Sequence, residues 1–478
     1  MEGNKKEIML KIDGIDVYAI EGTSILDVAK TAGIKIPTLC YNPAIRALLA
    51  CRICSVEIID KRGKKRIVPS CIYPVFEGLV VDTKSENVVR KRQELIKSLF
   101  ARCPNAKAIQ ELAREYDVEK PSLLVGNPEE DCIRCGLCVR VCKEKVGVSA
   151  IESADKSMEQ DVNAAYLTIS DDCVGCGACA AICPTNSKNV RMNPYLMLEK
   201  DIKEAEDQFL NGTRDELLGV YTEIFAAKSS IDGQDGGMVT ALLLSGMKKG
   251  LFDAVIVVKR TEGYKAEAIV AETADEILNA RGTKYSRVKT TSKVEKLIEK
   301  GKRKIAIVGT PCEVRKARKM QQRLLSTYPD LEITIVGLFC FEAFDYEKLK
   351  EETKRLLGVD LDKAKKTQIQ KGKFIVTVDG KEYSAKVKEF HHATQGGCAY
   401  CNDFVGRLSD VSVGAVGSAE GYSTVIVRSE KGKKLLENVD FVKGDVDKEA
   451  IIKLASFKKR RAENNFAPII EGRSTELK

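Results

Sequence analysis

Two runs of closely spaced cysteines are the residues of this 478-residue chain that are best suited to redox chemistry. Each run has the spacing C-x2-C-x2-C-x3-C, in which three thiolates of one loop bind a 4Fe–4S cube and the fourth reaches a neighbouring cube. The runs are Cys132, Cys135, Cys138, Cys142 and Cys173, Cys176, Cys179, Cys183. The spacing therefore predicts one cluster on Cys132, Cys135, Cys138 and Cys183, and a second on Cys142, Cys173, Cys176 and Cys179.

A third cysteine group follows a segment with the pattern of a small sheet. Residues 7–20 alternate as two strands around a turn at Gly14, and residues 24–32 form an amphipathic helical pattern with Thr23 as the expected N-cap. Strand–turn–strand–helix before a cysteine-rich loop is the order of β-grasp 2Fe–2S ferredoxins. The spacing of the group resembles the 2Fe–2S domain of the NADH dehydrogenase large subunit and of iron hydrogenases. This resemblance implies a 2Fe–2S domain over residues 1–82, with the ligands Cys40, Cys51, Cys54 and Cys71.

The surroundings of these thiols favour iron over the alternatives. Zinc sites usually pair two C-x2-C units over a longer gap, and disulfides need an oxidising compartment. Residues 1–10 contain no apolar signal-peptide segment, so we expect a cytoplasmic protein with reduced thiols. No apolar run approaches the roughly 20 residues of a membrane span.

The formal net charge of +9 is weak evidence for nucleic-acid binding. Four bound clusters, each about −2 when oxidised, would bring the protein near neutrality. The local basic runs, at residues 61–66, 300–304 and 458–461, are expected to be solvated faces or docking sites for an acidic partner or an anionic coenzyme. We expect no nucleic acid as a partner.

Three further segments separate the cysteine groups from the second half of the chain. Residues 83–125 read as two helices, in which Cys103 is expected to be a small buried residue or a free thiol rather than a cluster ligand, since no histidine lies nearby. Residues 126–196 form the twin-cluster domain, with an extra hairpin between Cys142 and Cys173. Residues 197–220 are charged and helical, as expected of a linker or a docking helix.

From about residue 221, apolar strands alternate with helices, which indicates an α/β domain over residues 221–478. The expected elements are helices over 238–248 and 294–300 and strands over 254–258, 304–308 and 333–338. Residues 455–478 are basic and polar, and we expect them to form a surface tail. The chain as a whole is thus predicted to be a multidomain protein of mixed α/β and α+β class.

Short glycine-rich and cysteine-containing motifs mark this second half. There is no G-x-G-x-x-G after a strand, so dinucleotide binding of the Rossmann type is unsupported. Gly233–Gly237 (GQDGG) precedes a helix, where free N–H groups suit a pyrophosphate, although a tight turn explains it equally well. The other motifs are GTKYS at 282–286, GTPC at 309–312, GLFC at 337–340, KGKF at 371–374, CAYC at 398–401 and GAVGSAEGYST at 414–424.

In this order, the motifs resemble the flavin-bearing beta subunits of coenzyme F420-reducing hydrogenase, F420-dependent formate dehydrogenase and F420H2 dehydrogenase, over residues 221–440. The resemblance implies an archaeal oxidoreductase subunit with bound FAD, a coenzyme F420 site and a further 4Fe–4S cluster. Cys312, Cys340, Cys398 and Cys401 would hold that cluster, with zinc as the alternative.

The resemblance also implies which residues contact the flavin and the coenzyme. The flavin segments are Gly233, Gln234, Asp235, Gly236, Gly237, Thr240, Lys284, Tyr285 and Ser286. The segment nearest the flavin ring and the coenzyme is Gly417, Ser418, Gly421, Tyr422 and Ser423. Lys371 and Lys373 would meet coenzyme phosphate or, equally well, form solvated surface.

Electron counting then predicts a function. Clusters carry single electrons, coenzyme F420 takes a hydride, and a flavin exchanges both. The chain is therefore expected to pass electrons from a partner oxidoreductase through its clusters to FAD and coenzyme F420, in a reversible reaction. The partner would be of the formate dehydrogenase, hydrogenase, CO dehydrogenase or heterodisulfide reductase type. The alternative is an electron-transfer adaptor without flavin chemistry.

Overall fold

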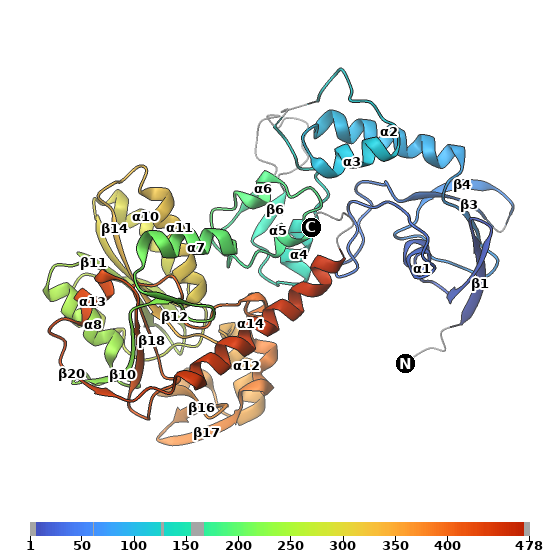
Figure 1. Cartoon of the computed structure of the whole chain (residues 1–478). Coiled ribbons are helices and arrows are strands. Elements are labelled where there is room, and N and C mark those ends of the chain that lie inside the picture. Colours follow the sequence, from blue (N-terminus) through green and yellow to red (C-terminus); the bar gives the residue numbers. More distant parts are fainter. Residues whose placement is uncertain (1–5, 61, 126–128, 154–166, 473–478) are drawn as a thin grey trace.

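The computed structural model describes residues 6–60, 62–125, 129–153 and 167–472. The N-terminal sheet lies at one end of an elongated molecule and the C-terminal sheet at the other (Figure 1). The cysteine-rich segment with α4 and α5 lies between them, and the last helix, α14, returns from the C-terminal sheet towards this segment (Figure 1).

Residues 7–82 form a five-stranded sheet in the order β2-β1-β5-β3-β4. Its strands are β1 (Glu7–Ile12), β2 (Ile15–Ile20), β3 (Ser55–Ile59), β4 (Lys65–Pro69) and β5 (Val80–Asp82). β1 pairs antiparallel with β2 and parallel with β5, as in a β-grasp fold. Helix α1 (Ile25–Thr31) is capped by Ser24, whose hydroxyl accepts the Asp27 N–H at 3.2 Å. The assignment of Thr23 as the cap was wrong by one residue, because both hydroxyl residues precede the same apolar run.

Two helices connect this sheet to the twin cysteine runs. α2 (Glu86–Arg102) and α3 (Lys107–Glu115) cover the range in which two helices were expected. Their apolar faces, with Ile96 and Ile109, pack with Leu39 and Ile53 from the cysteine-bearing loop of the first domain. Cys103 is fully buried in the same core, in agreement with the prediction.

The twin-run segment is built on two short helices that each begin just after a left-handed glycine. α4 (Leu137–Glu144) follows Gly136 at φ 71°, and α5 (Ala178–Ile182) follows Gly177 at φ 88°. Only glycine adopts such angles without strain, so each cysteine loop can turn sharply into its helix. The expected hairpin appears as β6 (Ile151–Ser153) paired antiparallel with β7 (Leu167–Ile169), and its connection lies outside the described residues. α6 (Lys188–Arg191) follows the second run.

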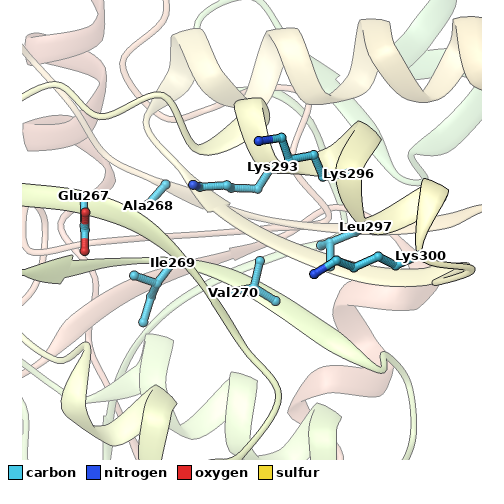
Figure 2. A pocket seen from close by; sticks show the side chains of 8 residues that line it. All are labelled: Glu267, Ala268, Ile269, Val270, Lys293, Lys296, Leu297 and Lys300. Atoms are coloured by element: carbon cyan, nitrogen blue, oxygen red, sulfur yellow. The ribbon is translucent and has the colours of Figure 1, made fainter.

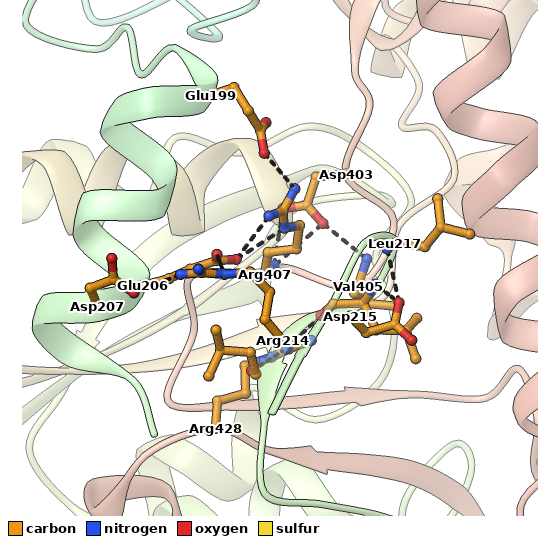
Figure 3. Close-up of polar contacts among 12 residues, drawn as sticks. Glu199, Glu206, Asp207, Arg214, Asp215, Leu217, Asp403, Val405, Arg407 and Arg428 are labelled. Carbon is orange, nitrogen blue, oxygen red and sulfur yellow. Dashed lines mark hydrogen bonds and ion pairs between the residues drawn. The ribbon is translucent and has the colours of Figure 1, made fainter. Parts of the chain in front are cut away.

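Residues 199–221 pack against the C-terminal half. They form α7 (Glu199–Phe209), β8 (Thr213–Asp215) and β9 (Gly219–Tyr221). Ile202 and Ala205 of α7 belong to the hydrophobic core of the large sheet. Arg407 donates from Nε to the fully buried carboxylate of Glu206 at 3.1 Å (Figure 3). The segment expected as a linker or docking helix is therefore an integrated part of this half.

An eight-stranded mixed sheet forms the centre of the C-terminal half, in the order β12-β11-β13-β14-β18-β19-β10-β20. Its strands are β10 (Glu223–Ser229), β11 (Ala254–Arg260), β12 (Ala266–Ala271), β13 (Lys304–Gly309), β14 (Glu332–Leu338), β18 (Val411–Gly414), β19 (Ser423–Val427) and β20 (Phe441–Gly444). β11, β13, β14 and β18 are parallel. β10 points the same way, because β19 pairs antiparallel with both β18 and β10.

Helices cover both faces of this sheet. One core contains α10 (Val294–Glu299), which follows η1 (Thr290–Lys293), and α11 (Pro311–Leu324). The other contains α8 (Met238–Lys248), α9 (Ala274–Asn279) and α13 (Glu430–Leu436). The predicted α/β alternation is thus observed, and α8 has the predicted bounds.

A small lobe that the sequence patterns did not predict is inserted after β14. It consists of α12 (Tyr346–Leu357), η2 (Leu361–Lys363), β15 (Lys366–Gln370), β16 (Lys373–Val378), β17 (Lys381–Lys386) and η3 (Val387–Ala393). Its core contains Phe344, Phe374 and Phe390, with the rings of Phe374 and Phe390 5.0 Å apart. A short helix, η4 (Gly396–Tyr400), leads back to the large sheet.

The last helix corrects the expectation of a surface tail. α14 (Lys448–Glu471) buries Ile451, Lys458, Ala462 and Ile469 along its length. Near its end, the Ile469 carbonyl accepts a hydrogen bond from Asn42 Nδ2 at 2.9 Å. The helix therefore joins the C-terminal half to the first domain. The composition of residues 455–478 predicted a tail because only a few buried residues, such as Ala462 and Ile469, are spaced among many basic and polar ones.

Candidate redox sites

The first cysteine group lies in the loops that surround the N-terminal sheet. The Sγ atoms of Cys40 and Cys51 are 3.3 Å apart. A hydrogen bond from Cys51 lowers the pKa of Cys40 to about 6, and one from Cys71 lowers the pKa of Cys54 to about 7. The same hydrogen bonds raise the pKa of the donor thiols, Cys51 and Cys71. The nearby thiols of Cys40 and Cys51 add to the rise for Cys71, so the structure brings together all four residues that the sequence grouped.

The last cysteine of each twin run lies near the other run, as the predicted ligand sets require. Burial raises the pKa of Cys135 to about 12, and the nearby thiols of Cys183 and Cys132 add to the rise. Burial likewise raises the pKa of Cys142, and the thiol of Cys173, from the other run, adds to it. Each predicted set therefore combines three thiols of one loop with the last thiol of the other.

Polar groups also face these sulfurs. The Ala150 N–H donates to Cys142 Sγ at 3.3 Å, and the Ser187 N–H donates to Cys183 Sγ at 3.3 Å. Asn193 Nδ2 lies 3.4 Å from Cys173 Sγ. Hydrogen bonds to ligand sulfurs are one of the means by which a protein adjusts the potential of a cluster.

The last four cysteines come from different elements of the C-terminal half. Cys312 lies in the first turn of α11, directly after β13, and Cys340 follows β14. Cys398 belongs to η4, and Cys401 follows it. Although Cys340 keeps some exposed surface, protein surrounds its thiol and raises its pKa, and the thiols of Cys398, Cys312 and Cys401 act in the same direction. The structure therefore gathers residues that are 89 positions apart (401 − 312).

A polar network fixes the loop after Cys401. The Asp403 carboxylate accepts the N–H groups of Val405, Gly406 and Arg407 at 2.9–3.3 Å. Arg407 in turn binds Glu206 of α7 (Figure 3). Helix α7 thus helps to hold the loop that carries the last cysteine of the group.

Two residues of α14 that no sequence motif assigned to a site lie against this cysteine group. Lys458 Nζ donates to the Cys340 carbonyl at 2.5 Å and to the Asp403 carbonyl at 2.7 Å. Arg461 Nη2 donates to the Cys398 carbonyl at 3.1 Å. Both belong to the basic run 458–461, which was expected to be solvated or to serve as a docking site. That expectation was wrong for Lys458, which is 2% exposed.

The four cysteine groups follow one another in space. Burial is the largest cause of the raised pKa values of Cys135 and Cys138. The nearby Cys40 thiol adds to the rise for Cys135, and the nearby Cys179 thiol adds to the rise for Cys138. Burial raises the pKa of Tyr400 of η4, and the nearby Cys176 thiol adds to this rise, so Tyr400 lies close to Cys176. The spatial order is therefore the Cys40 group, the Cys135 group, the Cys176 group and the Cys398 group.

The contact between the third and fourth groups is tight. A Cβ atom on Gly396 would collide with the Val146 carbonyl, and one on Gly397 would lie 3.0 Å from Val174 Cγ2. Val174 is in the loop of the second cysteine run, and Gly397 precedes Cys398. Glycine at these positions lets the two cysteine loops approach closely.

The predicted flavin segments meet at one edge of the large sheet. β10, β13, β14 and β18 all end at this edge, and they lead into Gly233–Gly237, Cys312, Cys340 and Gly417 respectively. The carboxyl edge of parallel strands is where open α/β sheets usually bind ligands. Phe339, beside Cys340, packs on Gly414, so this edge also connects the last cysteine group to the segment 414–423.

Hydrogen bonds connect the individual segments. The Gly236 N–H donates to Ser423 Oγ at 3.1 Å, and the Thr283 N–H donates to Gln234 Oε1 at 2.9 Å. Gln234 Nε2 donates to the Thr367 carbonyl at 3.1 Å, which adds the small lobe to the same site. Gln234 therefore joins the GQDGG and GTKYS segments to β15 of the small lobe.

The remaining predicted residues differ in their settings. Tyr285 accepts the Ile369 N–H at 2.8 Å, and Lys284 donates to the Arg281 carbonyl at 2.9 Å. Ser418 donates to backbone carbonyls, including that of Tyr422 at 3.1 Å. Glycines 417 and 421 have φ of 88° and 79°, and Asp235 is exposed, while Thr240 and Ser286 are half-buried. Lys371 and Lys373 are exposed at the turn between β15 and β16, two and four residues beyond Ile369.

A cavity of about 360 Å³ lies elsewhere, between β12 and α10. Glu267, Ile269 and Val270 line one side, and Lys293, Lys296 and Lys300 line the other (Figure 2). None of these residues belongs to the glycine segments or the cysteine groups. The cavity lies at the open edge of the sheet and brings together no predicted site residue.

Among the described residues, no three cysteine, histidine, aspartate or glutamate side chains converge as they would on one metal ion. On a single tetrahedral zinc ion, zinc–sulfur distances of about 2.3 Å would place the four sulfurs about 3.8 Å from one another. The four thiolates of a 4Fe–4S cube bind four different irons, so their sulfurs lie further apart.

No helix within the described ranges is long and apolar enough to cross a membrane.

Four segments of the chain match known protein families. Residues 5–86 match a 2Fe–2S iron–sulfur cluster binding domain, and residues 128–192 match a 4Fe–4S dicluster domain. Residues 224–296 and 302–449 match the N-terminal and C-terminal parts of the coenzyme F420 hydrogenase/dehydrogenase beta subunit.

Similar proteins match about half of the chain. The F420-dependent sulfite reductase of Methanocaldococcus jannaschii is 38% identical over 51% of this chain and 42% of its own length. The coenzyme F420 hydrogenase beta subunit of Methanothermobacter thermautotrophicus is 35% identical over 52% of this chain and 96% of its own length. A subunit of the F420-reducing NiFe hydrogenase of Methanosarcina barkeri, a solved structure, is 30% identical with a TM-score of 0.49, over 53% of this chain and 93% of that one. The chain belongs to the coenzyme F420 hydrogenase/dehydrogenase beta subunit family and carries 2Fe–2S and 4Fe–4S dicluster domains before the family region.

Proposed function

We propose that this chain is the F420-converting subunit of a larger oxidoreductase. It exchanges electrons with a catalytic partner through one 2Fe–2S and three 4Fe–4S clusters. FAD, bound at the carboxyl edge of the large sheet, supplies the conversion between single electrons and the hydride that coenzyme F420 carries. The reaction is reversible, and its compartment is the cytoplasm.

The observation that carries this proposal is the spatial order of the cysteine groups. Cys40 lies near Cys135, Cys138 near Cys179, and Cys176 near Tyr400, which is next to Cys401. From there Phe339 reaches the segment 414–423. A row of this kind suits stepwise transfer of single electrons between a docking surface at the N-terminal domain and a flavin at the other end.

The residues at the sheet edge fit a flavin in three respects. Gly236 and Gly237 leave no room for side chains, since a Cβ atom on either would collide with a backbone carbonyl, so the turn before α8 packs closely against β10 and Ser423. Gly237 is the residue before α8, whose N-terminal N–H groups suit a pyrophosphate. Lys284 follows Thr283, whose N–H donates to Gln234, and so adds a cation next to the segment.

The partner determines the primary reaction. Relatives are named as subunits of F420 hydrogenase and F420H2 dehydrogenase and as an F420-dependent sulfite reductase. We propose a partner of the hydrogenase, formate dehydrogenase, CO dehydrogenase or heterodisulfide reductase type, which docks near the 2Fe–2S domain.

The test is anaerobic purification of the full chain, followed by flavin analysis and an assay of reduced coenzyme F420 with an artificial dye. We expect one FAD per chain, oxidation of reduced coenzyme F420, and about 14 irons from 2 + 4 + 4 + 4. A preparation with full iron but neither flavin nor this activity would favour the adaptor function. Stoichiometric zinc with about 10 irons would show that Cys312, Cys340, Cys398 and Cys401 hold no cluster.

A further inference from the structure

We propose that the buried ammonium of Lys458 is the counter-charge of the Cys312, Cys340, Cys398 and Cys401 site, and that it sets the reduction potential of the cluster there. The inference rests on the proposed function, because it assumes a cluster at this site. It assigns a role to a residue of the last helix, more than fifty positions from the nearest of these cysteines in the sequence.

The setting of Lys458 is unusual for a lysine. The residue is 2% exposed, and its two hydrogen bonds go to neutral backbone carbonyls, those of Cys340 and Asp403. The Asp403 carboxylate is instead occupied by the N–H groups of its own loop. Among the ion pairs of the described residues, Lys459 binds Glu216 and Arg461 binds Glu342, while none includes Lys458.

A buried cation without an ion-pair partner is costly, unless negative charge lies close by. Here the nearby negative charge would come from the cysteines. The Lys458 ammonium donates to the carbonyl of Cys340 and to that of Asp403, two residues beyond Cys401, so it lies directly beside the cysteine group. Cysteines bind iron as thiolates, and these would supply the negative charge next to the buried ammonium.

The effect on a cluster follows from charge. Reduction adds one electron to a group that is already about −2 with its four thiolates. A fixed positive charge in a medium of low dielectric constant stabilises the reduced form more than the oxidised form. Lys458 should therefore raise the reduction potential of this cluster, which is the one closest to the predicted flavin site.

Helix α14 holds the ammonium in place. Ile451, Ala455 and Ala462 are buried on the same side of the helix as Lys458, so the helix cannot easily turn the side chain away. Lys459, the next residue, lies at the surface with its side chain 34% exposed. The chain thus provides a matched control, which is the same substitution one position further along.

The experiment is a redox titration of the full chain followed by electron paramagnetic resonance. The signal of this cluster is identified as the one missing from Cys398→Ser. Lys458→Gln keeps a neutral donor for the two carbonyls but removes the charge, and we expect its midpoint potential to move to a lower value. Lys458→Arg and Lys459→Gln should keep the wild-type potential.

Each outcome decides the matter. If Lys458→Gln cannot bind the cluster but Lys458→Arg can, the counter-charge is required for assembly, which supports the proposal. Equal potentials in Lys458→Gln and the wild type would overturn it, as would loss of the cluster in both Lys458 variants, which would indicate a role in shape alone. If Cys398→Ser lacks no signal, there is no cluster at this site, and the proposed function fails together with the inference.

Discussion

Seventeen cysteines of identical chemistry lie in different surroundings in this chain. Cys103 shares a hydrophobic core with Cys40 and Cys135, but it lies directly after α2, outside the four cysteine groups, and its thiol donates to the Cys132 carbonyl at 3.4 Å. Burial raises the pKa of Cys103 to about 12, so this thiol stays protonated and unreactive at neutral pH.

Replacement of Cys103 by serine should therefore leave the iron content and the cluster signals unchanged. Because a hydroxyl group replaces a buried apolar thiol, the free energy of unfolding should fall by about 1 kcal/mol. Iron analysis and thermal unfolding of the anaerobic protein measure both effects. Loss of four irons in this variant would mean that Cys103 supports a further cluster.

Lys284 provides the clearest pH dependence. Burial, with Arg260 nearby, lowers its pKa to about 8. A lysine that binds phosphate must be protonated, so FAD affinity should be full below pH 8 and should fall as the pH rises through that value. We expect a loss of up to about tenfold between roughly pH 7 and pH 9, measured by fluorescence titration of the apoprotein.

The control for this experiment is Lys284→Arg. Arginine stays charged throughout this pH range, so the affinity of the variant should be nearly constant. An unchanged affinity of the wild type across the same range would show that Lys284 only caps α9 through the carbonyls of Ala280 and Arg281.

At the scale of elements, the turn between β10 and α8 depends on close backbone approach. A Cβ atom on Gly236 would collide with the Ala227 carbonyl and lie 2.6 Å from the Ser423 N. The turn, β10 and the end of the segment 414–423 therefore touch through a glycine, and Ser423 completes the contact by accepting the Gly236 N–H.

Gly236→Ala should force these segments apart. We expect a loss of about 2 kcal/mol in the free energy of unfolding and a much weaker retention of FAD, with the iron of the N-terminal domains unchanged. Gly250→Ala is the comparison, because Gly250 lies just beyond the other end of α8 and a Cβ atom there would have no neighbour within 4 Å. At its φ of 66° alanine costs about 1 kcal/mol of backbone strain, so this variant loses stability without displacing the turn. If both variants keep FAD equally, the flavin does not lie on this turn.

At the scale of the whole molecule, the row of cysteine groups separates two activities. In the proposed function, chemistry at the flavin would need only the C-terminal half, whereas exchange with the partner would need every cysteine group between them. The 2Fe–2S domain lies at the far end of the molecule from the large sheet (Figure 1). A break at this end should therefore affect coupling alone.

Cys51→Ser should spare the oxidation of reduced coenzyme F420 by a dye and should weaken or abolish the coupled rate in the native complex. Cys103→Ser serves as the control, with both rates retained. An intact coupled rate in Cys51→Ser would place the 2Fe–2S centre outside the main path and would indicate that electrons enter at the 4Fe–4S dicluster domain.

The sequence alone predicted those features that depend on the physics of a short stretch of chain. The spacing of the twin runs follows from the reach of one loop around a cube, and the bounds of α8 follow from a glycine before an apolar helix. The first two strands, the helix that follows them and the buried state of Cys103 were predicted for similar reasons, since alternation and the absence of nearby ligands are visible along the chain.

The features that depend on contacts between distant segments are visible only in the tertiary structure. Asn42 meets Ile469 across 427 positions, and Lys458 reaches Cys340 across 118. Residues 458–461 are all basic, so their composition predicts a solvated surface. It does not reveal that other elements place the carbonyls of Cys340 and Asp403 next to Lys458. The last helix therefore lies against the Cys340 and Cys398 carbonyls of the candidate site through contacts that no single stretch of the sequence contains.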